Sequence, residues 1–144
     1  MARVRIDLPE LFPFSTALEV RVTDLNYGNH LANDALLALL HEARVRFLRA
    51  HGMHEGDVGG TVLIMNDAAV VYRAEAFAGD QLRIDVALVD PSRVGCDFVY
   101  RVSRPSDGKL VAEAKTGVVF LDPVSRRVVK LPAGLLSLMT PAGA

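Results

Sequence analysis

The chain has little cysteine and no excess of charge of either sign, and each shortage excludes a class of protein. Its one cysteine, Cys96, cannot form an intrachain disulfide. The 16 Lys and Arg residues nearly balance the 17 Asp and Glu residues, for a formal net charge of −1. Without a basic excess, the electrostatic basis for general nucleic-acid or membrane-surface binding is missing. We therefore expect neither nucleic acid nor a membrane as a partner.

Long apolar runs and nucleotide-binding fingerprints are also missing. No run approaches the length that spans a membrane, and the N-terminal "MARVRIDLPELF" lacks the apolar core of a signal peptide. The chain contains neither the Walker glycine loop nor the dinucleotide glycine fingerprint. These absences predict a soluble cytoplasmic protein that holds no nucleotide cofactor in the usual loops.

What the chain does have is apolar material in a length typical of one domain. At 144 residues it can bury one core but not two full ones, so we expect residues 1–144 to form a single domain. Hydrophobic residues make up 51% of the chain and its mean hydropathy is +0.26. A small monomer cannot easily hide that much apolar surface, which predicts a homodimer or homotetramer.

A single segment has a strong helical period. Four of its apolar residues share one face: Leu36, Leu40, Ala43 and Phe47. Asn29 or Asn33 is expected to cap the start of this helix, and Gly52 is expected to end it.

Strand-like runs occupy much of the rest of the chain: residues 16–22, 61–77, 81–90, 95–104 and 109–122. Leu18, Val20 and Val22 would share the buried face of the first run. Turn chemistry separates the later runs, including Asp107-Gly108. Long meandering strands around one helix predict an α+β domain, with an antiparallel sheet wrapped around a long central helix.

The polar loop before the helix carries a resemblance to a known family. "RVTDLNYGNHLAND" followed by "LLHEARVRFL" resembles the hotdog-fold thioesterases, in particular the 4-hydroxybenzoyl-CoA and acyl-carrier-protein thioesterase branches. "VVYRAEAFAGDQLRI" and "LVAEAKTGVVFLDPVSRRVVKLP" extend the resemblance over nearly the whole chain. It implies a hotdog fold and hydrolysis of an acyl-CoA or acyl-carrier-protein thioester, a reaction that needs no cofactor or metal.

The resemblance also implies where the site lies. The family places the thioester carbonyl near the helix N-terminus, where free backbone N–H groups and the helix dipole stabilise an oxyanion. Asn26 and His30 would then act on the thioester. Asp24, Tyr27, Gly28 and Asp34 would bind the substrate.

The chain departs from the 4-hydroxybenzoyl-CoA branch at the catalytic carboxylate. Two residues after Asp24, that branch has an aspartate and this chain has Asn26, which cannot serve as a general base. The acid must then be Asp24, Asp34 or Glu42. We prefer Glu42, because a partly buried carboxylate on an apolar helix would have a raised pKa that suits base chemistry.

Each candidate also has a purely structural interpretation. Asp24 is typical of a turn, Asp34 suits the first turn of a helix, and Glu42 is spaced to pair with Arg46. His30 is as consistent with a bond to a loop carbonyl as with catalysis, and Gly28 with a simple turn as with close approach to a substrate.

Other signals are weaker. "HEARV" lacks the second histidine of a zinc-protease motif, and His51 and His54 are better explained as surface residues than as metal ligands. Cys96 is expected to be buried. Scattered arginines such as Arg73, Arg93 or Arg126 would meet CoA phosphates.

Two rival functions stay open. One is a hotdog hydratase or dehydratase, which would act on a β-hydroxyacyl thioester with a histidine and a carboxylate. The other is an acyl-CoA-binding or sensing module without turnover, which the missing loop carboxylate favours.

Overall fold

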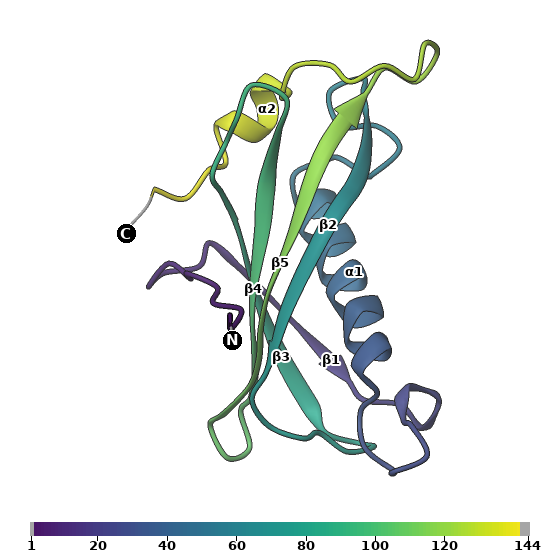
Figure 1. Ribbon diagram of the computed structural model, residues 1–144, viewed down its shortest axis with the longest axis vertical. Helices are drawn as coiled ribbons and strands as arrows, with labels where there is room; N and C mark the ends of the chain where they lie inside the picture. The colour runs from purple at the N-terminus through teal and green to yellow at the C-terminus, as the bar shows by residue number, and fades with distance from the viewer. Residues whose placement is uncertain (1, 142–144) are drawn as a thin grey trace.

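The computed structural model describes residues 2–141, and these form one antiparallel sheet packed against one long helix (Figure 1). The sheet order is β1-β3-β4-β5-β2, and every pairing is antiparallel. In chain order the elements are β1 (Phe14–Glu19), the 3-10 helix η1 (Val22–Asp24), α1 (Asn33–Ala50), β2 (Val62–Tyr72), β3 (Gln81–Val89), β4 (Gly95–Arg104), β5 (Lys109–Leu121) and α2 (Ala133–Leu136). The predicted α+β hotdog architecture is confirmed.

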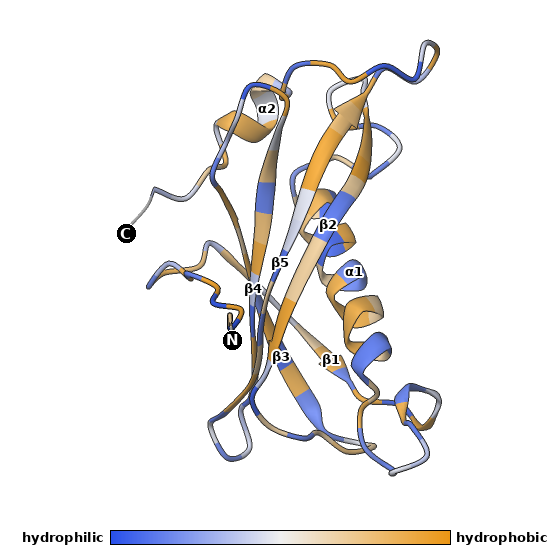
Figure 2. Ribbon diagram, in the orientation of Figure 1, coloured by the Kyte–Doolittle hydropathy of each residue, from blue (hydrophilic) through white to orange (hydrophobic). Residues whose placement is uncertain are grey.

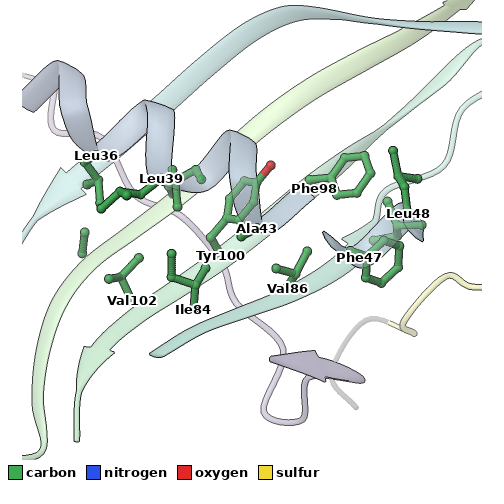
Figure 3. Packing of buried hydrophobic residues seen from close by; sticks show 14 of the residues in the cluster. Leu36, Leu39, Ala43, Phe47, Leu48, Ile84, Val86, Phe98, Tyr100 and Val102 are labelled. Carbon is green, nitrogen blue, oxygen red and sulfur yellow. The ribbon is translucent and has the colours of Figure 1, made fainter. Parts of the chain in front are cut away.

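The apolar face of α1 builds the core. Leu36, Leu40, Ala43 and Phe47 are buried, as their spacing predicts. They pack against side chains from the central strands, including Phe98 (Figure 3). The rings of Phe47 and Phe98 meet edge to face, with centroids 5.8 Å apart.

The two ends of α1 differ in how well the sequence predicts them. Gly52 adopts φ +74°, and the Met53 N–H donates to the Leu48 carbonyl at 2.9 Å, so the predicted glycine C-cap is confirmed. The predicted asparagine N-cap is wrong. Ala32 holds the cap position and offers no side-chain acceptor, and Asn33 is already the first helical residue.

β4 spans the predicted run 95–104, and its predicted inward residues are buried: Cys96, Phe98, Tyr100 and Val102. β1 is shorter than predicted. It ends at Glu19, and Val22 lies in η1 with 77% of its surface exposed. Val22 therefore does not share the buried face of Leu18 and Val20, because the chain turns away from the sheet after Val20.

The N-terminal segment crosses the outer face of the sheet. The Arg101 guanidinium lies 4.7 Å from the centroid of the Phe12 ring, and Val99 beneath this segment is buried. β2 is an edge strand, with a polar stretch in its middle that Figure 2 shows clearly. Met65 is 46% exposed there, and the register shifts between Met65 and Asp67.

No helix among residues 2–141 is both long enough and apolar enough to cross a membrane.

Candidate functional site

The loop between η1 and α1 is shaped by its own polar groups. The Asn26 side-chain oxygen accepts the Gly28 N–H at 2.9 Å, and the Asn26 N–H donates to the His30 carbonyl at 3.0 Å. The Leu31 N–H donates to the Ala76 carbonyl at 2.8 Å, which ties the loop to the segment after β2. Asn26 is therefore held at a defined position and is only partly exposed.

Asn26 and His30 converge on Gly28. A Cβ atom at Gly28 would lie 3.2 Å from both the Asn26 Oδ1 atom and the His30 Nε2 atom. Such contacts are crowded, so glycine lets these two side chains approach each other across the loop. Gly28 lies in a turn that its N–H bond to Asn26 closes, and close approach to a substrate stays a prediction. Tyr27, at the tip of the loop, is fully exposed.

The His30 ring is oriented by the chain that follows it. Its Nδ1 atom lies 3.4 Å from the Leu31 carbonyl oxygen, a weak hydrogen bond in the tautomer that carries the proton on Nδ1. That tautomer leaves Nε2, which faces Gly28, as the basic nitrogen.

Motif matching does not reveal the backbone conformation of Asn29. Asn29, immediately before His30, adopts φ +63°. Asparagine tolerates this left-handed conformation better than most residues do. The loop therefore turns through a left-handed residue directly before His30. The signal in the sequence was a second asparagine next to His30.

This loop leads directly into the N-terminus of α1, which no side chain caps. Within residues 2–141, the N–H groups of Asn33, Asp34 and Ala35 have no acceptor, and the first bond of α1 runs from Leu36 to Ala32 at 3.2 Å. Free N–H groups and the positive end of the helix dipole can stabilise a developing oxyanion.

Asp24 is engaged in a turn. Its carboxylate accepts the Arg21 N–H at 2.8 Å and two bonds from the Arg21 guanidinium at 3.2 and 3.0 Å. The hydrogen bonds from Arg21 lower the pKa of this buried carboxyl. Its place in η1 supports the structural interpretation over a role as the base.

Asp34 lies in the first turn of α1, exposed and next to Tyr72 of β2. The Tyr72 hydroxyl donates to the Asn33 carbonyl at 2.8 Å. Partial burial, and then the charge of Asp34, raise the pKa of the Tyr72 hydroxyl. Asp34 is thus a carboxylate at the mouth of the helix, on the side of the β2 edge.

Glu42 lies elsewhere. It lines a groove of about 510 Å³ between α1 and β1, together with Leu18, Arg21 and Arg46. Its side chain is 46% exposed and accepts the Arg46 Nε–H at 2.8 Å. We preferred Glu42 because we predicted that its carboxylate is partly buried, and that prediction is wrong. Nine residues of helix, about 13 Å of rise, separate it from Asn33.

A buried network of polar side chains, which the sequence did not reveal, links the middle of α1 to the sheet. Arg44, whose side chain is 7% exposed, donates to Glu55 at 2.7 Å and to the Tyr100 hydroxyl at 3.2 Å. Tyr100 in turn bonds Thr116 at 2.8 Å. A helical period marks the apolar face but gives no sign that an arginine within it has partners on two other segments.

The remaining candidate reactive or metal-binding residues lie in the core or contribute to local packing. Cys96 is buried, and burial raises the pKa of its thiol to about 12. His54 accepts the Gly56 N–H, and His51 packs on Phe47 with centroids 4.9 Å apart. In the described part of the chain, no three His, Cys, Asp or Glu side chains gather closely enough to hold a metal ion.

Similar structures share this fold. A 1,4-dihydroxy-2-naphthoyl-CoA thioesterase from Synechocystis is 22% identical, with a TM-score of 0.79 over 88% of this chain and 94% of that one. A probable thioesterase from Escherichia coli is 20% identical, with a TM-score of 0.71 over 88% and 98%. A Staphylococcus aureus protein solved in complex with CoA is 15% identical, with a TM-score of 0.78 over 93% and 85%.

Sequence comparison is more specific at the level of the family. No curated protein matches the chain. The model of the thioesterase-like superfamily matches residues 20–138, which include the loop, α1 and all but the first strand of the sheet. The chain therefore belongs to the thioesterase-like superfamily.

Proposed function

We propose that this protein hydrolyses acyl thioesters of CoA at the loop that precedes α1. One observation supports this most: Asn26 and His30 converge on Gly28 in the loop that leads into three backbone N–H groups without an acceptor. A thioester carbonyl bound there would accept hydrogen bonds from these N–H groups, and His30 would act as the base for a water molecule.

Each group has a distinct part in the proposed reaction. His30 Nε2 accepts a proton from the attacking water, and the Asn26 amide with the free N–H groups of α1 stabilises the oxyanion. Asp34, in the first turn of α1, supplies a negative charge that favours the imidazole as it becomes positive. Collapse of the tetrahedral intermediate returns that proton to the CoA thiolate and releases a carboxylic acid.

The site is incomplete in a single chain. Tyr27 is fully exposed and Tyr72 is 48% exposed, so water reaches the thioester position freely. We propose that a second copy covers it by pairing at the β2 edge, whose middle residues are exposed. Residues 66–72 would then face the loop of the partner.

One experiment separates this function from its rivals. The purified protein is incubated with a panel of aliphatic, aromatic and β-hydroxyacyl thioesters of CoA and of an acyl carrier protein, and both free thiol and new double bonds are measured. Thiol release supports hydrolysis. Double-bond formation identifies a dehydratase instead, and tight binding without any product identifies a sensor. The same panel compares acyl chain lengths and CoA with carrier-protein thioesters.

A further inference from the structure

His41 is an exposed histidine that other side chains nevertheless hold in place. Its Nε2 atom lies 2.6 Å from the Glu55 carboxylate, although 55% of its side chain is exposed. The same carboxylate accepts the Arg44 Nε–H at 2.7 Å, and the Arg44 side chain is buried. Arg44 also reaches the Tyr100 hydroxyl, so the imidazole is linked through Glu55 to the core.

This arrangement orders His41 more than stability requires. An exposed ion pair contributes little to folding, because ordering the side chains costs entropy and water screens the charges. Partial burial alone would raise the pKa of Glu55, but hydrogen bonds from Arg44 and His41 outweigh it and lower that pKa. Glu55 is therefore a carboxylate that accepts the Nε2–H of a neutral His41. In that tautomer Nδ1, which bonds no other group among residues 2–141, is a basic nitrogen with a fixed orientation.

His41 lies on the side of α1 that faces the edge strand β2. It follows Asp34 by about two helical turns, so both side chains project from the same side of the helix. Asp34 lies next to Tyr72 at the end of β2, whereas the Glu55 carbonyl accepts the Leu63 N–H at the start of β2. His41 and Asp34 therefore lie toward opposite ends of this strand.

Within a single chain, His41 is too far from the loop to act on the thioester. Eight residues of helix, about 12 Å of rise, separate it from Asn33. The antiparallel pairing of β2 that we propose for the dimer brings the start of one β2 beside the end of the other. His41 of one chain then approaches the loop and the helix N-terminus of the other chain.

We propose that the partner's His41 is a catalytic residue that orients the attacking water, and that the partner's Glu55 positions its imidazole. This inference rests on the proposed function. The water donates one hydrogen bond to His30 Nε2 and the other to Nδ1 of the partner's His41, which directs an oxygen lone pair at the thioester carbonyl. His30 takes its proton as the C–O bond forms. When the C–S bond breaks, that proton passes to the thiolate sulfur, and the second hydrogen stays on the carboxylic acid.

Mixed dimers test which chain supplies each histidine. One chain carries His30→Ala and the other carries His41→Gln, and two different affinity tags isolate the mixed dimer. If the two histidines of a site come from different chains, one site of this dimer keeps both of them; if they come from the same chain, neither site does. We expect His41→Gln alone to lower kcat about 10-fold to 100-fold with KM unchanged. The mixed dimer should recover about half of the wild-type turnover.

Glu55→Gln tests the positioning role. It should lower kcat about 3-fold to 10-fold, less than His41→Gln does, because the amide oxygen still accepts the imidazole N–H but carries no charge. Added to His41→Gln, it should cause no further loss, and an additive loss would overturn the positioning role. His54→Gln is the matched control, because His54 is an exposed histidine next to Glu55 that accepts the Gly56 N–H, and it should behave as the wild type. Circular dichroism checks that each variant folds.

Cross-linking tests the placement of His41 without turnover. In a mixed dimer of His30→Cys with His41→Cys, a short bismaleimide should join the two chains, and the buried Cys96 should not compete. Glu42→Cys in place of His41→Cys should give no link, because Glu42 lies on the side of α1 that faces β1. A link in a protein that hydrolyses no thioester supports the placement and overturns the hydrolase. Hydrolysis by the wild type, with neither a link nor recovery in the mixed dimer, overturns the role of His41 and leaves the hydrolase.

Discussion

At the scale of single residues, the unusual feature is Asn26, which stands where the 4-hydroxybenzoyl-CoA thioesterases that this loop resembles have an aspartate. Asn26 holds that position and its side-chain oxygen accepts the Gly28 N–H, so it already has a structural role. It can orient a carbonyl or a water molecule, but it cannot take a proton. The base in this account is therefore His30, and the supporting carboxylate is the one nearest the helix mouth.

One pair of variants tests whether Asp34 or Glu42 is the carboxylate that supports catalysis. We expect Asp34→Asn to lower kcat about 10²-fold, because the amide removes the negative charge that we propose to stabilise the imidazolium. Glu42→Gln should change kcat by no more than about threefold, since Glu42 forms an exposed pair with Arg46 on the side of α1 that faces β1. Steady-state thiol release measures both. A larger loss in Glu42→Gln than in Asp34→Asn would restore Glu42 as the catalytic acid.

At the scale of elements, η1 depends on an ion pair whose strength changes with pH. Hydrogen bonds from Arg21 lower the pKa of Asp24 in the folded chain. The pair therefore stabilises the fold fully above the ordinary carboxyl pKa of about 4, and this contribution is lost as pH falls toward the lowered value. The free energy of unfolding should differ most between the wild type and Asp24→Asn at neutral pH. Denaturant titrations at pH 7, 4 and 3 measure it, and a difference that stays constant would contradict this assignment.

The start of β4 tolerates no side chain at Gly95. A Cβ atom there would collide with the carbonyl oxygen of Val118, which is backbone of the neighbouring strand and cannot move aside. We expect Gly95→Ala to destabilise the protein by about 1–3 kcal/mol. Gly134→Ala in α2 is the matched control, because a Cβ atom at Gly134 meets nothing within 4 Å. Thermal unfolding compares the two, and an equal melting temperature would refute the predicted collision.

How far the sequence predicts these elements depends on the range of the interactions that form them. Cys96, Phe98, Tyr100 and Val102 recur at every second position, and turn residues flank the run, so β4 was predictable along its whole length. Val22 continued the alternation of β1 but left the sheet, because the Arg21–Asp24 turn depends on side-chain bonds that carry no periodic signal. Helical spacing identified the buried face of α1. It did not show that Glu42 faces β1 while Asp34 lies beside β2, since that requires the order of the strands.

At the scale of the whole molecule, the exposed β2 edge and the incomplete site lead to the same prediction. Sedimentation at micromolar concentration should give a mass about twice the 15.6 kDa of one chain, or a multiple of that dimer. Ala68→Lys places a charge on the exposed part of β2, and it should shift the protein toward single chains and reduce turnover together. A wild-type protein that sediments only as a 15.6 kDa species would refute pairing at this edge.

The most direct test of the whole account compares kcat/KM for an acyl-CoA between the wild type and His30→Ala. The account predicts thiol release by the wild type and a loss of about 10²-fold to 10⁴-fold in the variant, the usual range for a general base. Binding of free CoA should be unchanged, since His30 acts on the thioester and not on the nucleotide. Full activity in His30→Ala would contradict the loop as the reaction site, and a wild type that binds acyl-CoA without releasing thiol would contradict hydrolysis itself.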